Sequence, residues 1–467
     1  MARKTRKVIE KVEITGIADK GRSVGRSESG KVIFVEDVAP GDNVDVLVKK
    51  ERSDYIEGTV EKYNRYSEDR VDPFCKHYGV CGGCRWQHIR YDAQLRHKNL
   101  MVENAIKRIA KMKVDAWLPI LPAARTEYYR NKLEFAFSNK RWLTKEEIDS
   151  GIPNTEDVLG FHRPAAFDKI VDIEHCYLQE DPSNELRLAV KQLAIEQGLS
   201  FFDLRAQTGM MRHILIRITT LGEVMLIVSF FEEDQPAIKR LLDSVQDRIP
   251  QITTIFYCIN SKPNDYILDL EMVCYSGKGY IEERLGEVRF KIGPKSFFQT
   301  NSRQAEALYD EVVNFAELTG TENVYDLYTG LGSIALYIAR SCRQVVGIEE
   351  VADAIRDAKE NAALNDIQNA LFYAGDVKNV LTPEFAVKHG KPDVLITDPP
   401  RAGMHPEVVQ FLLQLAPPKI VYVSCNPSTQ ARDLNLLAEK YDVKKIRPVD
   451  MFPHTYHVET IALLQIR

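Results

Sequence analysis

The chain has 467 residues, of which 44% are apolar and 28% charged, and its formal net charge at pH 7 is −5. This length exceeds what one hydrophobic core supports, so about two to four domains are expected. The apolar runs fall far short of the roughly 18 residues that a membrane span needs, and the N-terminus lacks the apolar segment of a secretory signal. A cytoplasmic protein without a membrane segment is therefore expected.

Positive charge is concentrated in two segments of this acidic chain. Residues 1–26 hold eight Lys and Arg against three Asp and Glu, and residues 85–113 hold eight against two. Such a stripe is typical of a phosphate-binding surface, but it is equally typical of a solvated helix face.

Short β-type runs separated by glycine fill residues 8–65. They alternate apolar and polar residues, and PGD at 40–42 marks a turn. We expect a small β-barrel of about five strands over residues 1–66. A central α+β region over residues 67–285 follows, which begins with a helix at about 90–111 and includes a strand pair joined by LGE in HILIRITTLGEVMLIVSFF.

Three cysteines with the spacing Cys75-x5-Cys81-x2-Cys84 offer soft ligands on one glycine-rich loop. Such ligands suit an iron–sulfur cluster or a structural zinc ion. The chain lacks a second CxxC pair, which is common at zinc sites. A zinc site of three cysteines and one histidine remains open, with the candidates His77, His88 and His175.

From about residue 320, strand-like runs alternate with helices, a pattern that predicts a parallel sheet with right-handed crossovers. The tail KKIRPVDMFPHTYHVETIALLQIR holds two strands without an intervening helix. We expect these two strands to form an antiparallel edge pair that closes the sheet.

Acidic residues stand at the ends of four successive strands of this sheet, where ligands bind in doubly wound folds. They are Asp326, Glu349, Asp376 and Asp398. Gly330 and Gly332 allow a tight turn after the first strand. Glu349 is placed to accept hydrogen bonds from ribose hydroxyls. Glycines follow only the first of these strands, which argues against a pyrophosphate ligand. Together with the four acids, this pattern favours a ligand with a ribose, an adenine and a positive charge, such as S-adenosylmethionine.

The segments DLYTGLGSIAL, VVGIEE, DPPR and VSCNPSTQARDL, in this order, resemble the Rossmann-like class I methyltransferase domain of the RNA (uracil-5-)-methyltransferase family, here over residues 286–467. FFQTN at 297–301 and DMFPHTYHVETIALL match further family segments, and residues 1–66 resemble a TRAM domain of OB-like type. The resemblance covers the whole chain. It implies methylation of uridine C5, with 23S rRNA favoured over tRNA, and a [4Fe–4S] site in the central domain formed by Cys75, Cys81, Cys84 and a distal Cys176.

The chemistry requires a thiolate, because C5 of uracil is a weak nucleophile until a sulfur adds to C6, and a base that then removes the C5 proton. Cys425 is the candidate nucleophile. It ends a strand just before a helix, whose N-terminus is expected to lower the thiol pKa. Glu459 is the candidate base, with a pKa raised by burial. The resemblance favours it over His454 and His457.

The resemblance also assigns residues that contact the ligands. The cofactor set is Gln299, Tyr328, Gly330, Gly332, Glu349, Asp376 and Asp398. The RNA set is Phe297, Asp398, Arg130 and Lys132, where Asp398 stays open between the cofactor and the uracil N3–H. Thr329 and Ser333 stand where some relatives carry Cys and Asn.

RNA with the target base turned out of its stack is the expected partner of a monomeric protein. The helix at 90–111 could pack on the catalytic domain. An RNA cytosine-5 methyltransferase is disfavoured by the closing HVE segment. An amino-methylating enzyme is disfavoured because Arg401 replaces the aromatic residue of its DPPY-type motif. A non-catalytic RNA-binding protein would not need Cys425 and Glu459 together.

Overall fold

The computed structural model describes residues 7–18, 21–164 and 166–467. Parts of the basic segment 1–26, namely residues 1–6 and 19–20, lie outside the described residues. Contacts divide the chain into two units. The first unit comprises residues 1–79, 83–126 and 397–467, and the second comprises residues 80–82 and 127–396.

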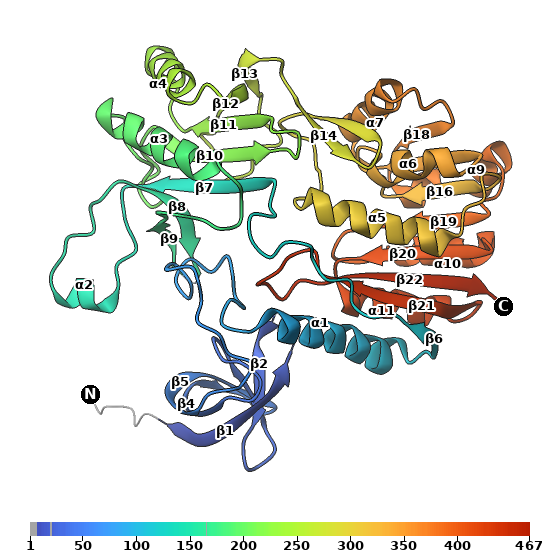
Figure 1. Cartoon of the computed structure of the whole chain (residues 1–467), viewed down its shortest axis with the longest axis horizontal. Coiled ribbons are helices and arrows are strands. Elements are labelled where there is room, and N and C mark those ends of the chain that lie inside the picture. The colour runs from blue at the N-terminus through green and yellow to red at the C-terminus, as the bar shows by residue number, and fades with distance from the viewer. Residues whose placement is uncertain (1–6, 19–20, 165) are drawn as a thin grey trace. The chain divides into compact units, whose positions relative to one another are not determined.

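Five strands at the start of the first unit close into a barrel in the order β1-β2-β3-β5-β4, drawn in blue in Figure 1. Alternate residues of these strands, such as Val12, Ile33 and Val44, fill its core. The predicted five-stranded barrel is confirmed. Its strands are β1 (Val8–Ile17), β2 (Ser23–Arg26), β3 (Val32–Val35), β4 (Asn43–Glu51) and β5 (Tyr55–Arg65).

The predicted helix at 90–111 is also present in the first unit. It consists of α1 (Tyr91–Ala105) and a π-helical turn, η2 (Ile106–Ala110). Both contact α11 (Pro427–Leu437), and the side-chain amide of Asn435 donates to the carbonyl of Ala110 at 2.9 Å. The helix therefore packs against the helix that follows Cys425.

Four strands of the first unit run in the order β20-β22-β21-β6. They are β20 (Lys419–Ser424), β22 (Glu459–Ile466), β21 (Tyr441–Val449) and β6 (Val114–Trp117), and α10 (Pro406–Leu415) precedes β20. The antiparallel pairing of β21 with β22 is confirmed. However, this pair does not form the edge, because β6 adds to β21 in parallel. The sequence pattern missed β6 because it comes from a distant segment and has only four residues.

The second unit contains a seven-stranded sheet in the order β13-β12-β11-β10-β7-β8-β9. Helix α3 lies on this sheet against β8 and β10, and beside α4. β10 and β11 form the predicted antiparallel pair. The strands are β7 (Lys132–Ser138), β8 (Val158–Arg163), β9 (Ala166–Asp172), β10 (Met211–Ile218), β11 (Val224–Phe230), β12 (Ile252–Ile259) and β13 (Val273–Gly277). The helices are α2 (Lys145–Asp149), α3 (Ser183–Glu196) and α4 (Gln235–Arg248).

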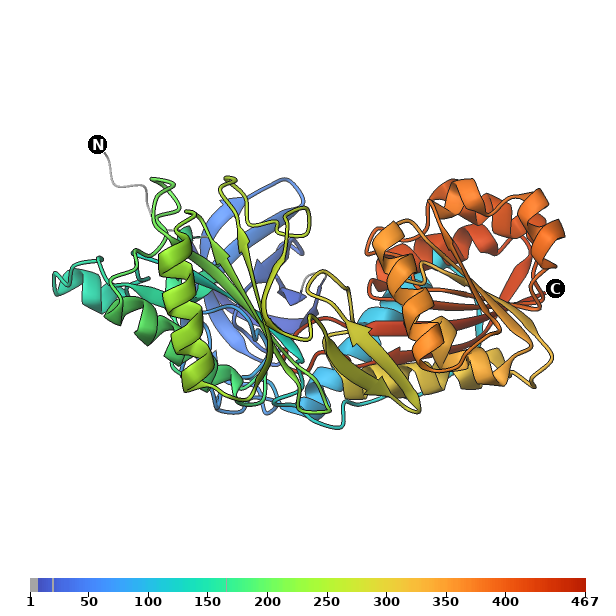
Figure 2. The same cartoon turned by 90° about the horizontal axis from the view of Figure 1, so that it is seen from above.

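A hairpin of β14 (Ile281–Leu285) and β15 (Val288–Ile292), yellow in Figure 2, leads to the parallel strands of the second unit. These strands run in the order β18-β17-β16-β19, and β16/β17 and β17/β18 pair in parallel as predicted. They are β16 (Asn323–Leu327), β17 (Gln344–Glu349), β18 (Ala370–Ala374) and β19 (Val394–Thr397). The helical segments are α5 (Ser302–Ala316), α6 (Ser333–Ile338), η3 (Ala339–Ser341), α7 (Ala352–Leu364), α8 (Val377–Val380) and α9 (Pro383–His389).

The strand–helix alternation predicted from about residue 320 is present, and the division into domains at 66 and 285 stays a prediction. Among the described residues, no helix is both long enough and apolar enough to cross a membrane.

Candidate active site

Cys425 and Glu459 are brought to facing positions by one antiparallel strand pair. β20 ends at Ser424, which pairs with Thr460 of β22. Cys425 follows this last pair and Glu459 precedes it, and the charge of Glu459 acts on the Cys425 thiol. Facing residues of an antiparallel pair have Cα atoms about 4.5–5.5 Å apart. The nucleophile and base predicted from the sequence therefore lie beside one another.

The pKa of the half-buried Cys425 thiol is raised to about 11, mainly by burial and then by the carboxyl groups of Glu459 and Asp398, and Arg401 acts in the opposite direction. The expectation of a lowered thiol pKa is wrong, because burial and two acidic neighbours outweigh the helix N-terminus.

Glu459 is only 7% exposed, and burial raises its pKa to about 8. The charge of Asp398 acts in the same direction, and the guanidinium of Arg401 opposes it. Burial also raises the pKa of Asp398, to about 7. The raised pKa expected for Glu459 therefore agrees with the structure, and it lies in the range that suits a general base near neutral pH.

The start of α11 holds the DPPR segment next to Cys425. The side chain of Asn426 caps the helix by accepting the N–H of Ser428, and its amide donates to the carbonyl of Arg401 at 3.1 Å. The hydroxyl of Thr429 donates to the same carbonyl at 3.2 Å. Pro427 occupies the first turn, where a missing N–H costs nothing. Asn426 and Pro427 thus fix both the turn after Cys425 and the neighbouring loop.

A buried carboxylate one turn further along completes this attachment. Asp433 accepts hydrogen bonds from the Tyr422 hydroxyl at 2.6 Å and from the Met404 backbone at 2.9 Å. Arg432 pairs with Asp433 at 2.7 Å and donates to the carbonyls of Ala402 and Met404. Sequence reasoning missed this network. Its signal was an aspartate at a helix position that the apolar neighbours mark as buried.

Gln430 links the two strands that carry the catalytic pair. Its buried amide donates to the carbonyl of Tyr422 in β20 at 2.9 Å and to that of Thr460 in β22 at 3.2 Å. These bonds fix the strand register next to Cys425 and Glu459.

The loop between β21 and β22 is anchored on α1. Lys98 and Asp450 form an ion pair of 2.6 Å in which both side chains are fully buried. The backbone N–H of His454 donates to the side chain of Gln94 at 2.8 Å, and burial lowers the pKa of His454 to about 4. His454 is therefore a structural residue of this loop. His457 is half-buried, and its Nδ1 lies 3.3 Å from the guanidinium of Arg401.

Several of the predicted cofactor residues of the second unit lie in a tight turn after β16. Tyr328, Gly330 and Gly332 all have left-handed backbones, with φ of 64°, 57° and 82°. The backbone N–H of Gly330 donates to Glu349 at 3.1 Å, and that of Val351 donates to the other carboxylate oxygen at 3.0 Å. These bonds orient the carboxylate and leave it lone pairs for ligand hydroxyls. The structure therefore brings the predicted turn and the predicted acid together.

Three other predicted ligand contacts belong to the second unit. Phe297 is 73% exposed, so its ring is available to a ligand. The carbonyl of Gln299 accepts the side-chain amide of Asn131 at 2.8 Å, which ties the FFQTN segment to the start of β7. Asp376 caps α8 by accepting the N–H of Lys378.

Arg130 and Lys132 flank Asn131 at the start of β7, and both are half-buried. Burial and the neighbouring Arg217 lower the pKa of Lys132. A contact of these residues with RNA stays a prediction.

The predicted cysteine ligands are divided between the two units, with Cys75 and Cys84 in the first and Cys81 and Cys176 in the second. Burial raises the pKa of Cys75, whereas hydrogen bonds from the backbones of His77 and Tyr78 lower it. Backbone donors to sulfur are typical around thiolate ligands of clusters. Cys75 therefore fits a ligand role, and the four-cysteine site stays a prediction.

Part of the basic stripe at 85–113 is used inside the first unit. Arg90 and Arg96 both pair with Asp69 and Asp92, and Lys98 is buried. These cations are less available to RNA than the sequence suggests.

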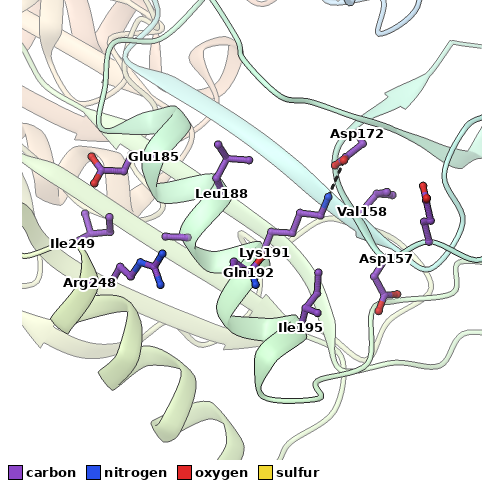
Figure 3. Close-up of a pocket in the computed structure, with 12 residues that line it drawn as sticks. Asp157, Val158, Asp172, Glu185, Leu188, Lys191, Gln192, Ile195, Arg248 and Ile249 are labelled. Carbon is purple, nitrogen blue, oxygen red and sulfur yellow. Dashed lines mark hydrogen bonds and ion pairs between the residues drawn. The ribbon is translucent and has the colours of Figure 1, made fainter.

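A cavity of about 910 Å³ in the second unit is separate from the predicted site. It lies along α3, where Leu188 and Ile195 are exposed, and it includes the ion pair of Lys191 with Asp172 (Figure 3). Its lining contains no residue of the predicted site.

Comparisons with known proteins identify the family. Residues 273–467 match the family model tRNA (Uracil-5-)-methyltransferase, and residues 3–60 match the TRAM domain. Relatives described as uncharacterized RNA methyltransferases occur in Bacteroides thetaiotaomicron and Porphyromonas gingivalis. The first is 51% identical over 97% of this chain and 100% of its own length, and the second is 50% identical over 97% and 99%.

A solved structure is similar along the same length. The Pyrococcus abyssi tRNA (uracil-54, C5)-methyltransferase, in complex with S-adenosyl-L-homocysteine, is 31% identical with a TM-score of 0.74. That match covers 98% of this chain and 100% of the other. The chain therefore belongs to the RNA (uracil-5-)-methyltransferase family and is an enzyme of that family.

Proposed function

We propose that the protein methylates C5 of a uridine in 23S rRNA, with Cys425 as the nucleophile, Glu459 as the base and S-adenosylmethionine as the methyl donor. The observation that supports this proposal is the end of the β20/β22 pairing at Ser424 and Thr460, next to which the charge of Glu459 acts on the Cys425 thiol. The cytoplasm, where such RNA is modified, is the proposed location.

The reaction begins when the Cys425 sulfur adds to C6 of the uracil and the C5–C6 electron pair moves toward O4. When bound, S-adenosylmethionine supplies the methyl group that C5 takes up. Glu459 then removes the C5 proton. The C5–C6 double bond re-forms, the C6–S bond breaks and the thiolate returns.

Arg401 has a specific part in this scheme. Its positive charge lowers the pKa of Cys425 and that of Glu459. It therefore stabilises the thiolate that attacks and the carboxylate that accepts the proton. The bonds of its carbonyl to Asn426 and Thr429 hold its backbone beside Cys425.

The proposed cofactor contacts are the turn from Tyr328 to Gly332, the carboxylates of Glu349 and Asp376, and the side chain of Gln299. The bound product S-adenosyl-L-homocysteine in the Pyrococcus abyssi relative supports the choice of donor. Asp398 is proposed to contact the donor or the uracil N3–H, and Phe297, Arg130 and Lys132 to contact RNA.

Cys75, Cys81, Cys84 and Cys176 are proposed to hold a [4Fe–4S] cluster, with structural zinc as the alternative. In anaerobically purified protein, Cys176→Ser should lose the brown colour and the iron. Colourless wild-type protein that contains stoichiometric zinc would contradict the cluster.

The choice of 23S rRNA rests on the resemblance of the cysteine cluster to the rRNA branch of the family. A tRNA target is the second candidate, because the similar Pyrococcus abyssi enzyme acts on tRNA. Mapping 5-methyluridine by mass spectrometry in cells with and without the gene decides between them. Loss of the modification from 23S rRNA is expected, and loss from tRNA alone would overturn the rRNA assignment.

A further inference from the structure

Two histidines and an aspartate of the second unit converge outside the proposed catalytic residues. His162 lies on β8, His213 lies on β10, and Asp265 lies in the loop after β12. One potential ligand atom from each lies within 4.8 Å of the others. Nε2 of His213 is 3.6 Å from Oδ1 of Asp265, a separation close to that of two ligands on one ion.

The sheet register explains why the two imidazoles meet. His213 pairs with Ala136 of β7, and Ala136 pairs with Gly160 of β8. His162 follows two residues after Gly160, so it points to the same face of the sheet. Ala136 carries only a methyl group and lines the space next to the two imidazoles, whereas Gly160 is covered by the backbone of Val171. On the opposite face, Arg187 of α3 covers Phe135.

Two further observations mark this place as a binding site. A cavity of about 10 Å³ is lined by His162, His213 and Asp265, which is room for about one water-sized particle. His213 is only 8% exposed, and among the described residues its Nδ1 has no hydrogen-bond partner. Nε2, and not Nδ1, faces Asp265 and is the ring nitrogen that an ion shared with this carboxylate would take.

Acidic and basic groups surround the three residues. Continuing the register sets Glu134 of β7 against His162, on the same face. Burial raises the pKa of Glu134, and the neighbouring charges of Lys132, Asp265 and His162 act on it, so its carboxyl group lies within electrostatic range. Arg212 donates to Asp265 at 3.0 Å and orients it. The acids Asp265 and Glu134 thus stand beside the cations Arg212 and Lys132.

We propose that His162, His213 and Asp265 bind one divalent transition-metal ion of the zinc or cobalt class. Neutral imidazoles and a carboxylate are the donors that such ions accept. The bound ion fixes the loop after β12, which Arg212 already holds through the carbonyls of Asn260, Lys262 and Asn264. The role is structural.

The test uses the full chain with its cysteine-bound metal retained, because thiolates also bind cobalt. Co²⁺ is added, excess is removed, and bound cobalt is measured by mass spectrometry and by its visible absorption. His162→Asn and Asp265→Asn should each weaken binding about ten-fold or more. His162 and Asp265 are exposed, so both variants should fold. Thermal melting of each variant and of the wild type in the presence of a chelator checks this.

Matched controls are available in the same chain. Asp269→Asn removes an exposed carboxylate from the same loop, where it pairs with Lys262. His405→Asn replaces an exposed histidine that caps α10 with another good cap residue. Both controls should bind cobalt like the wild type, with the absorption of nitrogen and oxygen ligands. The proposed site would be overturned if the wild type and all four variants bound the same amount of cobalt. It would also be overturned if the bound cobalt showed only the absorption of thiolate ligands.

Discussion

Replacing Glu459 by glutamine should make the protein more stable at alkaline pH while it abolishes turnover. The pKa of Glu459 is about 8 in the folded protein, against an ordinary value of 4.5. Between these values the native state keeps a proton that the unfolded chain releases. The penalty for burying the carboxylate is therefore absent below pH 4.5, grows as pH rises, and is complete above about pH 8.

The size of this effect follows from the same pKa. Each pH unit of the window corresponds to about 1.4 kcal/mol, so the complete penalty is at most about 5 kcal/mol. A glutamine keeps the shape of the side chain and carries no charge. The variant should therefore match the wild type near pH 4.5 and exceed it by a few kcal/mol at about pH 9.

Urea unfolding of both proteins at a series of pH values measures this difference. Glu439→Gln is the control, because Glu439 is exposed on the surface of the same unit, and it should show no such trend. If the difference in unfolding free energy between Glu459→Gln and the wild type does not change with pH, the claim that buried Glu459 keeps its proton in the folded protein is refuted.

Three other predictions follow from the same unit. Asp433→Asn removes the carboxylate charge to which the Tyr422 hydroxyl and the Met404 backbone N–H donate, so it should lower the free energy of unfolding in urea by about 1.5–3 kcal/mol. It should also lower kcat, because the loop that carries Arg401 is held less firmly. An unchanged kcat would argue that Asp433 does not position this loop. Lys98→Met leaves Asp450 buried without its partner and should cost about 3–5 kcal/mol, whereas adding Asp450→Leu should recover part of the loss in thermal melts. Glu459→Gln should accumulate a covalent protein–RNA adduct on unmodified RNA, because the sulfur still adds to C6 but the C5 proton is no longer removed. Denaturing gels would show this adduct. If the RNA instead runs free of protein, another residue is the base.

The sequence predicted the elements of the first unit better than their partners. The five barrel strands, the helix at 90–111 and the strand before Cys425 all follow from local apolar periodicity. β22 lies between β20 and β21, so it pairs with a strand that precedes it by one helix and one strand. Periodicity contains no information on such pairing. Facing positions for Cys425 and Glu459 could be proposed only from the family resemblance.

The electrostatics were harder still to predict. A helix after Cys425 was visible in the sequence and suggested a lowered thiol pKa. The burial of the thiol and the approach of Asp398 and Glu459 depend on the folded chain, and they reverse the sign. Likewise, the charges of Arg90 and Arg96 were visible, but their pairing with Asp69 was not.

The most direct test of the account is to trap the bond between Cys425 and C6. RNA that contains 5-fluorouridine cannot lose its C5 substituent as a proton, so the methylated adduct should persist. After digestion, mass spectrometry should find the methylated fluorouracil on the peptide with Cys425. Cys274→Ala, which removes an exposed cysteine, should leave the adduct intact, and Cys425→Ala should abolish it. An adduct on another residue, or one that survives Cys425→Ala, would contradict the account.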